Sequence, residues 1–136
     1  MMMNTKVRYA LRTLMEIALS EKPEGVYQKD ISFNQKISNK YLDSIISSLK
    51  VKGLIANAGG KRSGYLLATP VEKITLYDVY TAFEPVGIVP CINNPSICVK
   101  SADCKARKYW IRFKEDYEKI LSNRSLQQII EEEAYE

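Results

Sequence analysis

Apolar residues near the start of the chain recur at helical spacing and predict a first helix over residues 6–19. Its apolar stripe consists of Val7, Leu11, Leu14 and Ala18. Thr5 stands directly before the helix and is of a residue type that caps helix N-termini. Lys22-Pro-Glu-Gly25 then predicts a turn, and residues 27–34 predict a short helical segment around Ile31.

A second pattern predicts a helix that begins after its N-cap Ser38 and ends at Gly53. The stripe expected to be buried is Tyr41, Leu42, Ile45, Ile46 and Leu49. The opposite face carries Lys40, Asp43, Ser44 and Ser47 at positions i, i+3, i+4 and i+7. Because only residues 35–37 separate this helix from the preceding segment, the pair forms a candidate helix-turn-helix.

Residues 54–58 and 64–68 predict two short strands, joined by the flexible tip Gly59-Gly60-Lys61-Arg62-Ser63. A hairpin that follows a helix-turn-helix is typical of a winged helix, with the tip as the wing. Pro70 then interrupts the chain. Thr75-Leu-Tyr-Asp78 is a capping box that opens another helix.

No hydrophobic period is visible over residues 84–102, which contain Cys91 and Cys98, with Cys104 just beyond. A loop of this length inside a compact domain is commonly either functional or disordered. The longest helix is predicted over residues 103–121, and its apolar residues step by four and three, as in a heptad seam. This seam consists of Ala106, Trp110, Phe113, Tyr117 and Ile120. We expect it to pair with a second copy of the chain, and the alternative is packing into the chain's own core.

The fold class expected from these elements is mostly α with a small β-hairpin wing. Residues 1–70 would form a winged helix-turn-helix DNA-binding domain. Residues 71–136 would hold the cysteine loop and the dimerisation helices, including a short final helix capped by Ser125. With 136 residues, of which 46% are hydrophobic, the chain is expected to form one continuous structural unit.

Charge and composition narrow the function. Residues 1–70 carry 11 Lys and Arg against 5 Asp and Glu, whereas residues 71–136 carry 9 against 11. A basic front half indicates a polyanionic partner, of which a phosphate backbone is the obvious one. The chain has no His, which excludes catalytic sites and zinc fingers that depend on histidine. With no acid–base pair or phosphate-cradling loop visible either, we expect a binding protein and not an enzyme.

The sequence contains no stretch typical of a signal peptide or a membrane span. We therefore expect the cytoplasm, where three cysteines are more typical of metal binding or thiol chemistry than of disulfides.

Several motifs, in order along nearly the whole chain, resemble the winged helix-turn-helix regulator family of IscR, NsrR and CymR. They are Thr5-Lys-Val-Arg-Tyr-Ala-Leu-Arg12, Ile37-Ser-Asn-Lys-Tyr-Leu-Asp43, Gly53-Leu-Ile with Gly64-Tyr-Leu-Leu67, Ile74-Thr-Leu-Tyr-Asp-Val79, and Cys91, Cys98, Asp103-Cys104, Arg107 and Trp110. The resemblance implies a homodimeric transcription regulator, with repression expected, that binds a double-stranded operator with pseudo-two-fold symmetry.

The pattern and the resemblance together predict a set of DNA-binding residues. They come from the first helix, from both helices of the helix-turn-helix and from the wing. They are Lys6, Arg8, Gln28, Lys29, Ser38, Asn39, Lys40, Tyr41, Asp43, Ser44, Ser47, Lys61, Arg62, Ser63 and Tyr65. The chain departs from the family in the turn before the recognition helix, where Lys36 replaces a glycine. In the recognition helix, Asp43 and Ser44 replace Glu and Gln. These departures leave the operator sequence open.

By resemblance, Cys91, Cys98 and Cys104 match the ligands of an iron–sulphur cluster, with two irons favoured over four, which the purified protein can lack. Thiolates suit this chemistry. Family members complete the cluster with another side chain, but Arg107 and Arg8 occupy those positions here, and arginine is a poor ligand. The chain would then sense iron–sulphur status, nitric oxide or redox state. The alternative is a cluster-free regulator that acts by thiol redox chemistry or by binding a metabolic enzyme.

Overall fold

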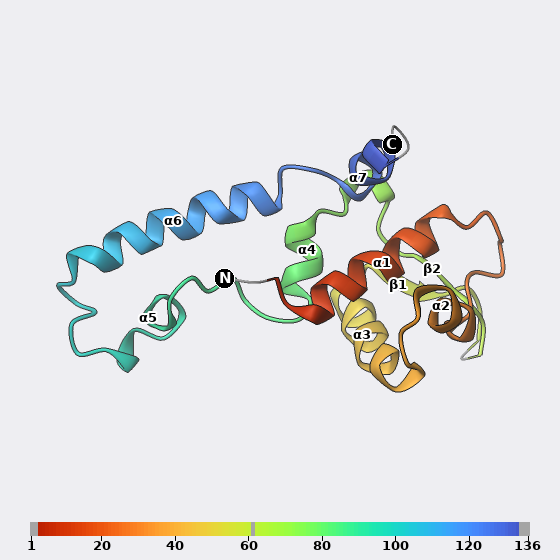
Figure 1. Cartoon of the computed structure of the whole chain (residues 1–136), viewed down its shortest axis with the longest axis horizontal. Helices are drawn as coiled ribbons and strands as arrows, with labels where there is room; N and C mark the ends of the chain where they lie inside the picture. The colour runs from red at the N-terminus through yellow and green to blue at the C-terminus, as the bar shows by residue number, and fades with distance from the viewer. Residues whose placement is uncertain (1–2, 61, 134–136) are drawn as a thin grey trace.

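The computed structural model describes residues 3–60 and 62–133. Four helices and a two-stranded hairpin form a compact head, and a long helix extends away from it (Figure 1). The head contains α1 (Thr5–Leu19), α2 (Gln28–Gln35), α3 (Asn39–Lys52), β1 (Ile55–Asn57), β2 (Tyr65–Leu67), the short 3-10 turn η1 (Val71–Lys73) and α4 (Leu76–Thr81). These elements confirm the expected fold class, a mostly helical winged helix.

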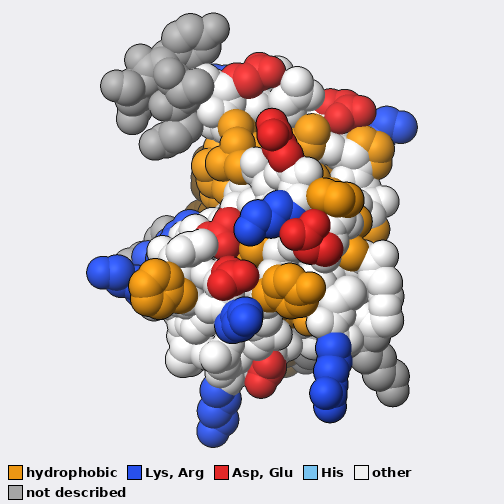
Figure 2. Space-filling model, turned by 90° about the vertical axis from the view of Figure 1, so that its right-hand side faces the viewer, with side chains coloured by type: hydrophobic (Ala, Val, Ile, Leu, Met, Phe, Trp, Pro, Cys, Tyr) orange, Lys and Arg blue, Asp and Glu red, His pale blue; other side chains and the backbone are white. Residues whose placement is uncertain are grey.

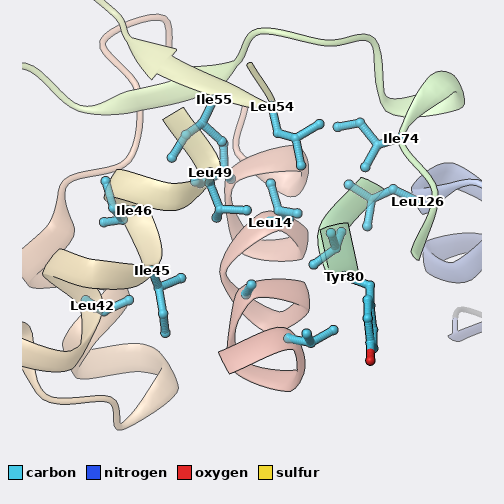
Figure 3. Close-up of a cluster of buried hydrophobic side chains, with 14 of the residues drawn as sticks. Leu14, Leu42, Ile45, Ile46, Leu49, Leu54, Ile55, Ile74, Tyr80 and Leu126 are labelled. Atoms are coloured by element: carbon cyan, nitrogen blue, oxygen red, sulfur yellow. The ribbon is translucent and has the colours of Figure 1, made fainter. Parts of the chain in front are cut away.

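The core of the head lies around α1, which contacts α2, α3, α4 and β2. Figure 3 shows Leu14 of α1 in the centre, between Leu49 of α3 on one side and Tyr80 of α4 on the other. The apolar stripe predicted for α3 is buried at Leu42, Ile45, Ile46 and Leu49, and Tyr41 is half-buried. Leu126, the first residue of the last helix, closes the cluster against Ile74.

Local capping chemistry sets the ends of the helices. Ser38 accepts a hydrogen bond from the Tyr41 N–H at 3.2 Å, and Gly53 ends α3 in the left-handed conformation at φ +82°, as expected. The capping box of Thr75 and Asp78 also forms. The predicted cap of α1 was wrong by one residue: the Asn4 side chain accepts from the Lys6 N–H at 2.7 Å, and Thr5 is the first helical residue.

The wing is an antiparallel hairpin in which Ile55 pairs with Leu67 and Asn57 pairs with Tyr65. Its second strand is also tied to the turn between α1 and α2, because Val26 and Tyr65 exchange both backbone hydrogen bonds at 3.0 and 2.8 Å. Gly25 and Gly64 make this contact possible. A Cβ atom on Gly25 would lie 2.7 Å from the Gly64 carbonyl carbon, and one on Gly64 would lie 2.5 Å from that of Gly25.

The second half of the chain consists of α5 (Pro90–Asn93), η2 (Pro95–Ile97), α6 (Lys105–Leu121) and α7 (Leu126–Glu133). We call residues 87–120 the arm, and Figure 1 shows α5 and most of α6 reaching away from the head. The segment predicted to lack regular structure therefore contains two short helical turns. The final helix returns to the head, where the Leu126 N–H donates to the Ile74 carbonyl at 2.6 Å. No helix within the described ranges is long and apolar enough to cross a membrane.

Candidate DNA interface and cysteine segment

The polar face of α3 is open to solvent along its length. Its predicted base-reading residues are all exposed: Lys40, Asp43, Ser44 and Ser47, together with Ser38 and Asn39 at the start of the helix. The apolar stripe on the other side of α3 is buried against α1, so the polar face must point away from the head. A compact, polar and exposed helix face is what insertion into a DNA major groove requires.

Gln28 connects the two helices of the helix-turn-helix. Its side-chain amide donates to Asp43 Oδ1 at 2.7 Å and lies 3.2 Å from the Asn39 carbonyl. Both acceptors belong to α3, so Gln28 sets where the recognition helix begins relative to α2. One carboxylate oxygen of Asp43 is engaged by this contact. The residue pattern could not reveal the pair, because Gln28 and Asp43 are 15 positions apart.

The wing lies beside the end of α3. The Lys50 ammonium lies 5.1 Å from the ring centre of Tyr65, a cation–π contact between α3 and β2. Burial, and secondarily the negative charge of Asp43, raises the pKa of Tyr65 above its usual value. Residues from α2, α3 and β2 therefore converge at Asp43. The helix and the wing form one surface.

The wing tip holds its shape through Ser63, whose hydroxyl accepts from the Gly59 N–H at 2.8 Å and donates to the Gly60 carbonyl at 2.6 Å. Ser63 therefore has a structural task in addition to its predicted DNA contact. Arg62 is exposed at this tip, and Lys61, also predicted to contact DNA, lies outside the described residues.

The remaining residues predicted to contact DNA differ in their exposure and in the side chains beside them. Lys29 is exposed on α2, with its ammonium 5.9 Å from the ring centre of Tyr27. Arg8 is exposed and donates to the Thr5 hydroxyl at 3.1 Å, whereas Lys6 is half-buried. Tyr41 packs edge-on against Tyr9 with ring centres 5.6 Å apart, so its main role in the structure is to join α3 to α1.

Lys36 occupies the turn between α2 and α3 in the left-handed conformation, with φ 56° and ψ 46°. It is the only non-glycine residue with a positive φ in the described part of the chain. A side chain makes this conformation unfavourable by about 1–2 kcal/mol, so the glycine expected here from the family resemblance would avoid this cost. In exchange, the turn gains an exposed cation beside the recognition helix. In Figure 2, basic side chains project from the lower edge of the molecule, where Figure 1 places this turn.

The predicted seam of α6 divides into two parts. Tyr117 packs against Tyr80 of α4 with ring centres 6.5 Å apart, so this residue contacts the chain's own head. Farther out, Trp110 and Phe113 contact each other and Tyr109, with ring centres 5.3 to 6.3 Å apart. Phe113 remains 38% exposed and Tyr109 52% exposed, and Ala106 and Ile120 are also exposed.

The three cysteines lie on the arm as free thiols. Cys91 is the second residue of α5, Cys98 directly follows η2, and Cys104 directly precedes α6. Within residues 3–60 and 62–133, no three His, Cys, Asp or Glu side chains are grouped closely enough to hold a metal ion. The Arg107 side chain donates to the Cys91 carbonyl at 3.4 Å. The thiols are suitable donors for an iron–sulphur cluster, but this arrangement of residues 91–104 does not fit one.

A helix-turn-helix with an exposed polar second helix, followed by a hairpin beside that helix, defines a winged-helix DNA-binding protein. The model of the Rrf2 family, described as an iron-dependent transcriptional regulator, matches residues 3–132. The chain belongs to this family, and it is a transcription regulator.

Similar proteins agree with this assignment. Protein rrf2 of Nitratidesulfovibrio vulgaris is 36% identical over 111 residues, which cover 81% of this chain and 74% of that protein. The regulator IscR of Yersinia enterocolitica is 30% identical over 131 residues, covering 96% and 79%. The structure of CymR, the global cysteine regulator of B. subtilis, superposes with a TM-score of 0.72 at 25% identity, covering 95% of both chains. The oxidized form of Staphylococcus aureus CymR gives 0.70 at 27% identity, with the same coverage.

Proposed function

We propose that the protein represses transcription as a homodimer that binds a pseudo-palindromic operator in the cytoplasm. The observation that carries this proposal is the exposed polar face of α3, held by Gln28 and flanked by the wing. Lys40, Ser44 and Ser47 would contact base edges, and the second oxygen of Asp43 could accept from a cytosine amino group. A dimer bound to an operator that overlaps a promoter would exclude polymerase without needing any further contact.

The exposed aromatic cluster of α6 supports dimerisation. Tyr109 and Phe113 are exposed on α6, most of which reaches away from the head (Figure 1), and a second α6 would cover them together with Trp110. Two recognition helices related by a two-fold axis would enter successive major grooves about 34 Å apart. This arrangement predicts half-sites separated by about one helical turn of DNA.

The wing is tested by the salt dependence of operator binding. An operator is first selected from a random pool of duplexes, and its affinity is then measured by fluorescence anisotropy across a range of salt concentrations. The double variant Lys61→Ala and Arg62→Ala should reduce the slope of log K against log salt by up to about 3.6 for the dimer, since each of its two wings loses two phosphate contacts and each lost contact lowers the slope by about 0.9. A matched pair on the arm, Lys105→Ala and Lys108→Ala, should leave the slope unchanged. An unchanged slope in the wing variant would remove the wing from the interface.

We also propose that the signal is received by Cys91, Cys98 and Cys104. Three soft donors lie within a short segment at the root of the helix that would join the two protomers, so chemistry there could change the spacing of the recognition helices. An iron–sulphur cluster is the first form of this signal to test, and binding one would require residues 91–104 to rearrange. The second candidate is oxidation of the thiols, which the accessible free cysteines favour.

One preparation separates these candidates. The protein is purified without air, and its absorbance spectrum, iron and acid-labile sulphide are measured. Coloured protein with stoichiometric iron and sulphide supports the cluster. Colourless protein that cannot be reconstituted, together with operator affinity that changes after mild oxidation, supports the thiol switch. Operator affinity that appears only with a metabolic enzyme present would instead support the partner-dependent alternative.

A further inference from the structure

A cavity lies between α1 and α2, on the opposite side of the head from the arm. Its volume is about 870 Å³, within the usual range of pockets that bind small molecules. The second half of α1, the turn over residues 20–27 and α2 form its walls. Neither the DNA interface nor the cysteine segment accounts for this cavity.

Hydrogen bonds close one end of the cavity. The Arg12 guanidinium donates to the Gln35 carbonyl and to Gln35 Oε1, the latter at 3.2 Å. Gln35 Nε2 in turn donates to Glu16 Oε1 at 2.7 Å, and Asn34 Nδ2 donates to the other oxygen of Glu16 at 3.2 Å. The start of α2 lies at the other end, beside the connecting turn. The two helices are therefore joined at one end and separated by open space at the other.

Charge of both signs lines this space. Its cations are Arg12, Lys22 and Lys29, and its anions are Glu16, Glu24 and Asp30. The ion pairs found in the described part of the chain lie elsewhere, so none joins two of these groups. The apolar part of the lining comes from Met15, Leu19, Val26 and Tyr27. On the face that carries this cavity, Figure 2 shows red and blue side chains set around orange hydrophobic ones.

We propose that this cavity binds a small zwitterion with an apolar body, of amino-acid or dipeptide size. An ammonium group would find carboxylates, a carboxylate would find Lys or Arg, and the apolar body would cover Met15 and Leu19. A ligand with one charge would complement lining charges of only one sign. The combination of both signs and an apolar lining therefore favours a molecule that carries both charges.

The position of the cavity gives such a ligand a route to the DNA interface, and this part of the inference rests on the proposed operator binding. Lys29 lines the cavity, and Gln28, its neighbour, holds Asp43 and the Asn39 carbonyl of α3. A ligand between α1 and α2 would shift α2 against α1 and so change where the recognition helix begins. The same α2 would bind both the small molecule and the recognition helix.

Calorimetry on the full chain without DNA tests the site. The probes are L-leucyl-L-leucine, its N-acetyl form, which lacks the ammonium, and its amide, which lacks the carboxylate. The unblocked dipeptide should bind, and each blocked form should bind about tenfold more weakly, because one charge-assisted hydrogen bond is lost. Equal binding of all three, or no binding of any at millimolar concentration, overturns the proposal.

Two variants locate the binding in this cavity. Leu19 is 63% exposed, so Leu19→Trp should obstruct the apolar part of the cavity without disturbing the core, and it should abolish binding. Leu19→Met should keep it. The double variant Lys22→Gln and Glu24→Gln, in the exposed turn, should bind the dipeptide no better than wild type binds the blocked forms. Wild-type affinity in Leu19→Trp, with an unchanged circular dichroism spectrum, would place the ligand elsewhere.

Operator binding is then measured with and without the dipeptide. A change in operator affinity that disappears in Leu19→Trp supports regulation through α2. Dipeptide binding without any change in operator affinity overturns the regulation and leaves the site. Failure of the chain to bind any operator overturns the proposed function, and the calorimetry without DNA remains a valid test of the cavity.

Discussion

The head and the arm of this protein are stabilised in different ways. The fully buried hydrophobic residues of the head run from Val7 to Val86, with Leu121 and Leu126 added from the other end of the chain. Residues 87–120, all of which the structure describes, contribute none. The head therefore has a core made by one chain. The arm instead exposes the aromatic residues Tyr109 and Phe113, which the proposed second copy of the chain would cover.

The largest expected effect is on the core of the head. Leu14 is fully buried at its centre, so Leu14→Ala should lower the free energy of unfolding by about 3 kcal/mol through lost contacts and the cavity left behind. Leu19→Ala on the exposed end of the same helix should change it by less than about 0.5 kcal/mol. Urea denaturation followed by circular dichroism measures both. Similar losses in the two variants would contradict a core centred on α1.

The arm should show the opposite response. Phe113→Ala should raise the dissociation constant of the dimer about 30-fold, which corresponds to about 2 kcal/mol for a central aromatic interface residue. Unfolding of the head should remain as in wild type. Analytical ultracentrifugation measures the dimer, and Glu115→Ala, exposed on the same helix, is the control. A loss of head stability without a change in oligomeric state would mean that the arm folds for its own chain alone.

A smaller effect, with the opposite sign, is expected in the turn of the helix-turn-helix. Lys36→Gly should raise the free energy of unfolding by about 1 kcal/mol, because glycine adopts the left-handed conformation without strain. Lys29→Gly, in the first turn of α2, should lower it, by less than the roughly 1 kcal/mol of a helix-interior position. Thermal unfolding compares the two. If Lys36→Gly also weakens operator binding, the strained residue contributes its cation to the DNA interface.

The smallest effect concerns Tyr80, where head and arm meet. Burial, followed by the charge of Glu84 and a hydrogen bond to its side chain, raises the pKa of Tyr80, with a further contribution from Tyr117. A raised pKa means that the folded state holds the phenol proton more tightly. This contribution to stability is therefore complete below the usual tyrosine pKa of about 10 and is lost as pH rises through the raised value. Tyr80→Phe should reduce the loss of stability above about pH 10. Urea midpoints of wild type and Tyr80→Phe at neutral and alkaline pH measure the difference. An equal loss of stability in both proteins would contradict a raised pKa of Tyr80.

The sequence predicted those features of the head that depend on neighbouring residues. The sequence predicted Ser38 and Gly53 as the two caps of α3, because capping depends on a few adjacent positions. The buried stripe of α3 follows from the helical period alone. Asn4 and Thr5 are both capping residue types, and only the path of the chain decides between them. The Gln28–Asp43 hydrogen bond joins positions too distant for any local pattern to reveal.

The arm was less predictable for a different reason. The heptad seam of α6 was visible in the sequence, but the contact of Tyr117 with Tyr80 depends on where α4 lies. The arrangement of Cys91, Cys98 and Cys104 could not be determined from their spacing, because they lie at three separate helical elements of a segment that adds no buried residue to the core. Because residues 87–120 add no buried hydrophobic residue to the core, the hydrophobic pattern of the sequence does not determine how this segment packs.

The contact between Gly25 and Gly64 also limits how the wing can vary in length. Two backbones meet there with no space for a side chain, and Val26 and Tyr65 hold them in a single register. An insertion on the α3 side of Gly64 can be absorbed at the hairpin tip, where residues 59 and 60 are exposed. An insertion between Gly64 and Leu67 would displace both the hairpin and the turn beside α2. We therefore expect regulators built on this contact to differ in the size of the wing tip and to keep the base of the wing constant.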